Sequence, residues 1–164
     1  MGRVEWSALS GDEVEAVLSN LLYNAYERAL RIRPSQGDFG IDVIVPAGSD
    51  PETWDVYQIK KFAQNLTTNQ KAQIEASFRR ILVALVRRGV PLRNWYLVTP
   101  LDPTLDNLLD WFAKIPEEAV TTLADEKDLK LTDAEEAQIR AWLSTSAHDS
   151  SCTIAHRPSC SERC

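Results

Sequence analysis

The chain has 164 residues, of which 44% are hydrophobic, enough for one ordinary domain with a single buried core. Its longest aliphatic run, residues 81–86, is too short to cross a bilayer, and residues 1–6 contain no apolar signal segment. These features argue against membrane partners and predict a cytoplasmic location. The formal net charge of −6 by itself argues against a nucleic-acid partner.

The charge is distributed unevenly, however. Residues 56–95 hold eight basic residues and one acidic residue, whereas residues 101–140 hold eleven acidic and four basic residues. A cationic stretch can follow a phosphate backbone even in an acidic protein, because the local field decides where a polyanion docks. The alternative is the solvated face of a helix, which would present only some of these cations on one side. The candidate phosphate contacts are Lys61, Lys71, Arg79, Arg80, Arg87 and Arg88.

The first predicted element is a helix that begins after Ser10. Ser10 and Glu13 have the spacing of a capping box, in which each side chain bonds to the backbone amide of the other residue. Apolar residues then recur every three or four positions up to about Leu30, which predicts one amphipathic helix. Pro34 and Gly37 indicate a turn-rich loop after it.

Two strands are predicted next, at residues 40–45 and 54–62, from their alternating, β-branched composition. The loop between them is longer than a tight turn, and the pair is predicted to be an antiparallel hairpin. Because alternate side chains of a strand share a face, we expect Gln58 and Lys60 to point one way and Tyr57 and Ile59 the other.

A second helix is predicted from Thr67 or Thr68 to the glycine at position 89, followed by a buried strand at residues 95–98. The order α-β-β-α-β predicts an α/β fold with a central mixed β-sheet flanked by helices. We assign this domain to residues 1–115. A short helix is expected near residues 105–112. Residues 116–144 are expected to form an acidic helical extension, with a helix at residues 133–143.

Residues 145–164 are expected to form a disordered tail, because they contain almost no large apolar residue. The abrupt change in composition also suits a chain whose original continuation has been lost. Cysteine and histidine recur in the tail at four-residue spacing, and these residue types suit a zinc site. The spacing is unlike paired cysteine motifs, and Pro158 would break an aligning helix, so we favour the tail interpretation for Cys152, His156, Cys160 and Cys164.

The polar residues of the predicted hairpin indicate phosphodiester chemistry. Hydrolysis of such a bond needs a divalent cation, and Mg²⁺ or Mn²⁺ prefers carboxylate and neutral oxygen ligands. We expect the Asp42 carboxylate, the Gln58 amide oxygen and the Ile59 backbone carbonyl to be ligands. Lys60 would bind a phosphate oxygen or orient the attacking water.

This pattern resembles the D…(D/E/Q)xK signature of the PD-(D/E)XK nuclease superfamily, in its Mrr-type restriction endonuclease branch. Asp42 and Gln58-Ile59-Lys60 carry the signature, and Val14-Glu15 followed by Gly37-Asp38-Phe39-Gly40-Ile41-Asp42 is similar to that branch's helix and loop. The resemblance covers roughly residues 10–100. It implies a restriction-endonuclease-like core and Glu15 as a further catalytic, metal or water ligand.

The resemblance also implies a magnesium-dependent endonuclease that hydrolyses DNA, with a role in defence against foreign DNA and with a homodimer as one way to cut both strands. A nuclease for RNA or for branched junctions would share the same site. The alternative from another class is a catalytically inactive nuclease-like module for nucleic-acid binding or interaction within a larger defence or signalling system. The acidic segment after Pro100 has no counterpart in the resemblance.

Each candidate also has a purely structural interpretation. Glu15 suits the first turns of a helix, where the macrodipole favours a carboxylate, and Asp38 suits a turn. Lys60 and Lys61 would protect an edge strand from pairing with another chain. Asp42 is harder to explain in this way, because an acid within a β-branched strand is disfavoured.

Overall fold

The computed structural model describes residues 5–32, 39–47, 52–62, 66–100, 110–123, 130–146 and 153–155. The fold is α/β with a mixed sheet, as the sequence predicts. Among these residues, no helix is both long and apolar enough to cross a membrane. The elements in chain order are η1 (Trp6–Ala8), α1 (Gly11–Ala25), β1 (Leu30–Arg31), β2 (Val43–Pro46), β3 (Trp54–Ile59), α2 (Thr68–Arg87), β4 (Leu92–Val98), α3 (Asp110–Leu123), α4 (Asp133–Ser146) and β5 (Thr153–Ala155).

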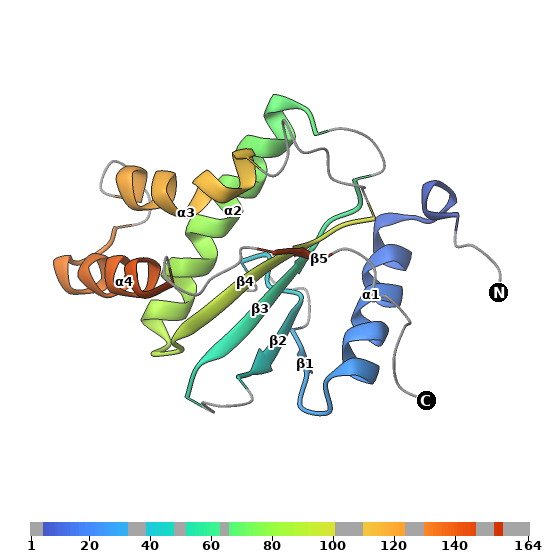
Figure 1. The fold of residues 1–164 in the computed structure, drawn as a ribbon, viewed down its shortest axis with the longest axis horizontal. Coiled ribbons are helices and arrows are strands. Elements are labelled where there is room, and N and C mark those ends of the chain that lie inside the picture. The colour runs from blue at the N-terminus through green and yellow to red at the C-terminus, as the bar shows by residue number, and fades with distance from the viewer. Residues whose placement is uncertain are drawn as a thin grey trace.

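The sheet has the strand order β1-β2-β3-β4-β5. Strands β1, β2 and β3 pair antiparallel, whereas β3, β4 and β5 pair parallel. Helix α1 covers one face of the sheet, and α2 lies on the other with α3 and α4 packed outside it (Figure 1). The predicted antiparallel hairpin and the predicted flanking of a mixed sheet by helices are both confirmed.

Helix α1 begins as predicted but ends earlier. The Ser10 amide donates to Glu13 Oε2 at 2.7 Å, and the Glu13 amide donates to Ser10 Oγ at 3.2 Å, so the capping box is present. The helix ends at Ala25, because Tyr26 has an extended backbone. Leu30, which the sequence placed in this helix, instead pairs with Ile44 and forms β1. The predicted element order therefore lacked one strand.

Alternation along β3 sends successive side chains to two different cores. Tyr57 and Ile59 pack with Val14 beneath α1, whereas Val56 packs with the core around α2. Gln58 also faces α2, where its side chain contacts Ser77. The predicted division between the two faces is confirmed for the residues of β3.

The boundaries of the hairpin strands differ from the prediction at both ends. Phe39 and Gly40 have positive φ angles of 55° and 86°, so the chain turns there and β2 begins only at Val43. Ile41 consequently packs on the α2 side rather than beside Val43. Strand β3 ends at Ile59, although the Lys60 amide still donates to the Val98 carbonyl at 2.9 Å and keeps the chain beside β4.

Helix α2 follows its sequence signals closely. Thr67 caps it through a second capping box with Gln70, and Gly89 adopts a φ of 63° just past its end. Residues 105–109 of the predicted short helix lie outside the described residues, but Phe112 is buried in α3. Helix α4 begins at Asp133 as predicted and reaches Ser146.

Two parts of the tail are described, and residues 145–146 complete α4. Residues Thr153–Ala155 form β5, which pairs with β4 through Tyr96, Leu97 and Val98. The expectation of disorder throughout residues 145–164 is therefore wrong for these residues, because the outer side of β4 offers unpaired backbone groups that a short strand can satisfy. The four cysteine and histidine positions lie outside the described residues.

Candidate functional site

Asp42 lies against the strand that carries Gln58 and Lys60. Its carboxylate Oδ2 accepts the Ile59 backbone N–H at 2.6 Å, and its own N–H donates to the Tyr57 carbonyl at 3.1 Å. A hydrogen bond to an ionised carboxylate is stronger than a neutral one, so this contact ties the loop before β2 to the end of β3. The structure thus places Asp42 beside the Gln58-Ile59-Lys60 segment, as the sequence predicts.

Gln58 is completely buried, and only one end of its amide is satisfied. Its Nε2 donates to Ser77 Oγ on α2 at 2.6 Å, and the Ser77 hydroxyl donates to the Phe39 carbonyl at 3.4 Å. Gln58 Oε1 is buried without a hydrogen-bond partner among the described residues. Leaving a buried amide oxygen unpaired costs about 1–3 kcal/mol, so an unpaired oxygen at this position calls for an explanation.

Gly40 closes tightly over the Gln58 side chain. A Cβ at this position would lie 2.6 Å from Ser77 Oγ and 2.9 Å from Gln58 Nε2. The loop before β2, the strand β3 and the helix α2 therefore meet at one point, where only a glycine fits. Both Gly40 and Gln58 belong to motifs that are visible in the sequence. Ser77 carries no such signal, because it sits in the apolar stripe of α2 like an ordinary small core residue.

The two lysines that follow β3 have different surroundings. Lys60 is half-buried at the end of the strand. Lys61 Nζ donates to the backbone carbonyl of Leu9, so it joins the end of β3 to the segment before α1. Lys61 therefore has a backbone partner in the described structure, and its predicted contact with phosphate stays a prediction.

Glu15 is paired with an arginine that the sequence did not single out. Glu15 Oε1 accepts from Arg31 Nη2 at 3.0 Å, and Arg31 lies opposite Val43 in the β1–β2 ladder. Within the described ranges, no three His, Cys, Asp or Glu side chains lie together as a metal site would require. A cation site built only from acids and histidines is therefore not assembled by this part of the chain.

A site that combines one acid with neutral oxygens fits better. The Asp42 carboxylate, the unpaired Gln58 oxygen and the Ile59 carbonyl come from one loop and one strand. These are hard oxygen ligands of the kind that Mg²⁺ and Mn²⁺ bind, with water completing the shell. The unpaired Gln58 oxygen, on the strand whose Ile59 amide binds Asp42, indicates that these residues suit such an ion. Asp38, predicted as a turn residue, lies outside the described residues.

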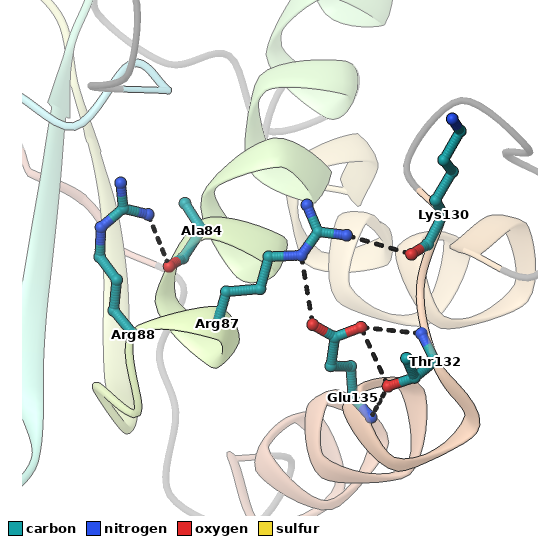
Figure 2. A network of polar contacts seen from close by, with 6 residues as sticks. All are labelled: Ala84, Arg87, Arg88, Lys130, Thr132 and Glu135. Carbon is teal, nitrogen blue, oxygen red and sulfur yellow. Dashed lines mark hydrogen bonds and ion pairs between the residues drawn. The ribbon is translucent and has the colours of Figure 1, made fainter.

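The predicted cationic surface is partly covered by the acidic extension. Arg87 Nε donates to Glu135 Oε1 at 3.2 Å and its Nη2 to the Lys130 carbonyl at 3.1 Å, which fastens α4 to the end of α2 (Figure 2). Glu135 also accepts the Thr132 backbone N–H at 2.7 Å, and this bond is the main cause that lowers the pKa of Glu135. Arg87 therefore has a structural partner.

The other predicted phosphate contacts differ in exposure. Lys71 Nζ lies 5.1 Å from the ring centre of Trp111 on α3, and the Trp111 indole donates to Glu75 at 2.6 Å. Arg79 is half-buried, whereas Arg80 and Arg88 are exposed. Arg88 lies over the ring of Phe39 at 5.4 Å and so stands beside the loop that leads to Asp42.

Comparisons of this chain with protein-family models, with curated proteins and with solved structures find no match. The candidate site therefore depends on its own residues and their geometry.

Proposed function

We propose that the chain is a metal-dependent endonuclease that hydrolyses DNA phosphodiester bonds, with the core of a PD-(D/E)XK restriction endonuclease. One observation carries the proposal. The buried Gln58 oxygen has no partner within the described structure, and it belongs to the residue next to Ile59, whose amide binds the Asp42 carboxylate. A carboxylate and an unpaired amide oxygen on adjoining backbone segments are ligand types that a hard divalent cation binds.

The proposed roles follow from the chemistry of each group. Asp42, Gln58 Oε1 and the Ile59 carbonyl would hold Mg²⁺ or Mn²⁺, which when bound neutralises phosphate charge and lowers the pKa of a coordinated water. Lys60, one residue beyond β3, would bind a non-bridging phosphate oxygen or orient the attacking water. We leave Glu15 outside the ligand set, because its carboxylate is paired with Arg31.

DNA is the proposed substrate because an exposed cation lies near the loop. Arg80 is exposed on α2. Arg88, the residue just after α2, is also exposed; its Nη1 donates to the Ala84 carbonyl at 2.9 Å, and it stands over Phe39, three residues before Asp42. Contacts of this kind position a phosphate backbone without reading its sequence. A role in defence against foreign DNA comes from the resemblance to restriction endonucleases alone.

Cleavage of a supercoiled plasmid with Mg²⁺ or Mn²⁺ tests the proposal. The wild type should nick the plasmid, and a metal chelator should stop it. Asp42→Asn is the sharpest variant, because the new side chain keeps an oxygen for the Ile59 amide but loses the charge that the cation needs. It should lower nicking roughly 100-fold or more, as should Lys60→Ala, while both variants unfold at nearly the wild-type temperature. A wild type that cuts neither DNA nor RNA nor a branched junction would refute the proposal.

A second function is favoured by one observation. The pairing of Glu15 with Arg31 suits a nuclease-like module that binds nucleic acid without cutting it. In that case the wild type and both variants would be equally silent in the nicking assay. All three would still shift a DNA fragment in a gel.

A further inference from the structure

The two ends of the Gln58 amide are chemically different, and only one can bind a cation. The oxygen has lone pairs, whereas the NH₂ group carries two hydrogens and can only donate. The rotation of the amide therefore decides whether Gln58 attracts or repels a positive ion. A carboxylate at this position would present an oxygen either way, so the need for a fixed rotation is specific to glutamine.

Ser77 is placed to fix that rotation. It is 6% exposed in the middle of α2, and its Oγ accepts Gln58 Nε2 at 2.6 Å. Its hydroxyl donates to the Phe39 carbonyl, with 3.4 Å between the two oxygen atoms, so the lone pairs of Oγ remain for the amide hydrogens of Gln58. The NH₂ end is thereby held toward α2, and the oxygen is left as the unpaired end.

Gly40 keeps this arrangement closed from the loop side. Any side chain there would push into both Ser77 Oγ and Gln58 Nε2. We infer that Ser77 is a positioning residue, which turns the oxygen of Gln58 toward a divalent cation through its hydroxyl. This inference rests on the proposed function, because that function places a divalent cation next to the Gln58 oxygen.

Binding of Mn²⁺ to the protein alone, measured by isothermal titration calorimetry without DNA, tests the role of Ser77. Ser77→Ala removes the hydroxyl and should weaken Mn²⁺ binding roughly threefold to tenfold, the range expected for one lost hydrogen bond. Alanine has the highest helix propensity, so α2 should form, and a thermal melt of each variant checks this. Ser19→Ala is the matched control, since Ser19 is 1% exposed in α1 and its hydroxyl has no partner among the described residues. It should leave Mn²⁺ binding unchanged.

A double-mutant cycle separates positioning from packing. In a Gln58→Glu background the carboxylate offers an oxygen in either rotation, so Ser77→Ala should change Mn²⁺ affinity by no more than about twofold. An equal loss in both backgrounds would show that Ser77 acts only through packing and would overturn the inference. Tighter Mn²⁺ binding by Ser77→Ala would show that the hydroxyl holds the oxygen end, which also overturns it.

The remaining outcomes separate the role of Ser77 from the proposed function. A wild type that binds Mn²⁺ and nicks DNA, with Ser77→Ala equal to it in affinity, would remove only the role of Ser77. A wild type that binds no Mn²⁺ at millimolar concentration would remove both the metal site and the role of Ser77. If Ser77→Ala weakens Mn²⁺ binding when Gln58 is present but not in the Gln58→Glu background, the result supports both the metal site and the role of Ser77.

Discussion

Replacing Gly40 by alanine should disrupt the point where the loop, β3 and α2 meet. The added Cβ would lie 2.6 Å from Ser77 Oγ and 2.9 Å from Gln58 Nε2, closer than carbon atoms normally approach such groups. The φ of 86° is also unfavourable for any residue with a Cβ. Two penalties therefore act together at this position, and a set of glycine variants can separate them.

The backbone penalty is about 1–2 kcal/mol and the overpacking penalty about 1–3 kcal/mol. Gly40→Ala should thus destabilise the protein by roughly 2–5 kcal/mol. Gly89→Ala meets the first penalty only, because Gly89 has a φ of 63° and a Cβ added there would meet nothing within 4 Å. Gly11→Ala should meet neither, since its φ is not positive and its surroundings are open.

Urea denaturation followed by tryptophan fluorescence measures the three free energies of unfolding. The difference between Gly40→Ala and Gly89→Ala should be about 1–3 kcal/mol, or roughly 2–12 °C in Tm for a chain of this size. Gly11→Ala should be unchanged or slightly more stable. If Gly40→Ala proves no worse than Gly89→Ala, the close packing of the loop onto Gln58 is wrong, and the fixed amide is wrong with it.

Two further predictions concern the cations of α2. The Thr132 backbone N–H, and to a smaller extent Arg87, lower the pKa of Glu135, so the contribution of this carboxylate to stability is full above the unfolded pKa of 4.5 and is lost as the pH falls through the lower folded value. The wild type and Glu135→Gln should therefore converge in Tm below about pH 4.5, and an unchanging gap would contradict the lowered pKa. Arg88→Ala should weaken DNA binding severalfold in fluorescence anisotropy and should reduce the slope of log K against log salt concentration by about 1. Arg87→Ala should have a smaller effect, because Arg87 is held by Glu135. The reverse order would refute the assignment of Arg88 to the DNA surface.

Local signals predicted the helices and strands, but they located the ends correctly only where a capping residue or a glycine marks them. The capping boxes at Ser10 and Thr67 and the glycine at position 89 marked helix ends correctly, because each depends on residues a few positions apart. The end of α1 was missed because Leu30 continues the helical period in sequence but pairs with Ile44, fourteen residues away, in space. Pairing between distant segments outweighs a local pattern, and no period in the sequence reveals it.

Contacts between distant segments, which a local pattern does not reveal, also explain which residues of the candidate site were not predicted. Asp42 was predicted to lie beside the strand of Gln58, Ile59 and Lys60, and the bond from the Ile59 amide places it there because a hairpin suffices to bring the two segments together. Ser77 and Arg31 were not predicted, since one is a small residue in an amphipathic helix and the other belongs to a two-residue strand. Each is recognisable only through its partner, and the partner is known only when helix and sheet are packed.

The acidic extension also changes what the positive stretch can do. Arg87 is paired with Glu135, and Lys71 lies over Trp111, so α3 and α4 occupy cations along the outer side of α2. Arg88 points the other way, onto Phe39. Because a polyanion follows the local field rather than the net charge, pairing Arg87 with a carboxylate while Arg88 contacts the neutral Ala84 carbonyl and the Phe39 ring concentrates attraction beside the loop that leads to Asp42. Under the proposed function, a phosphate backbone would therefore meet this acidic protein beside Arg88 rather than along the whole of α2.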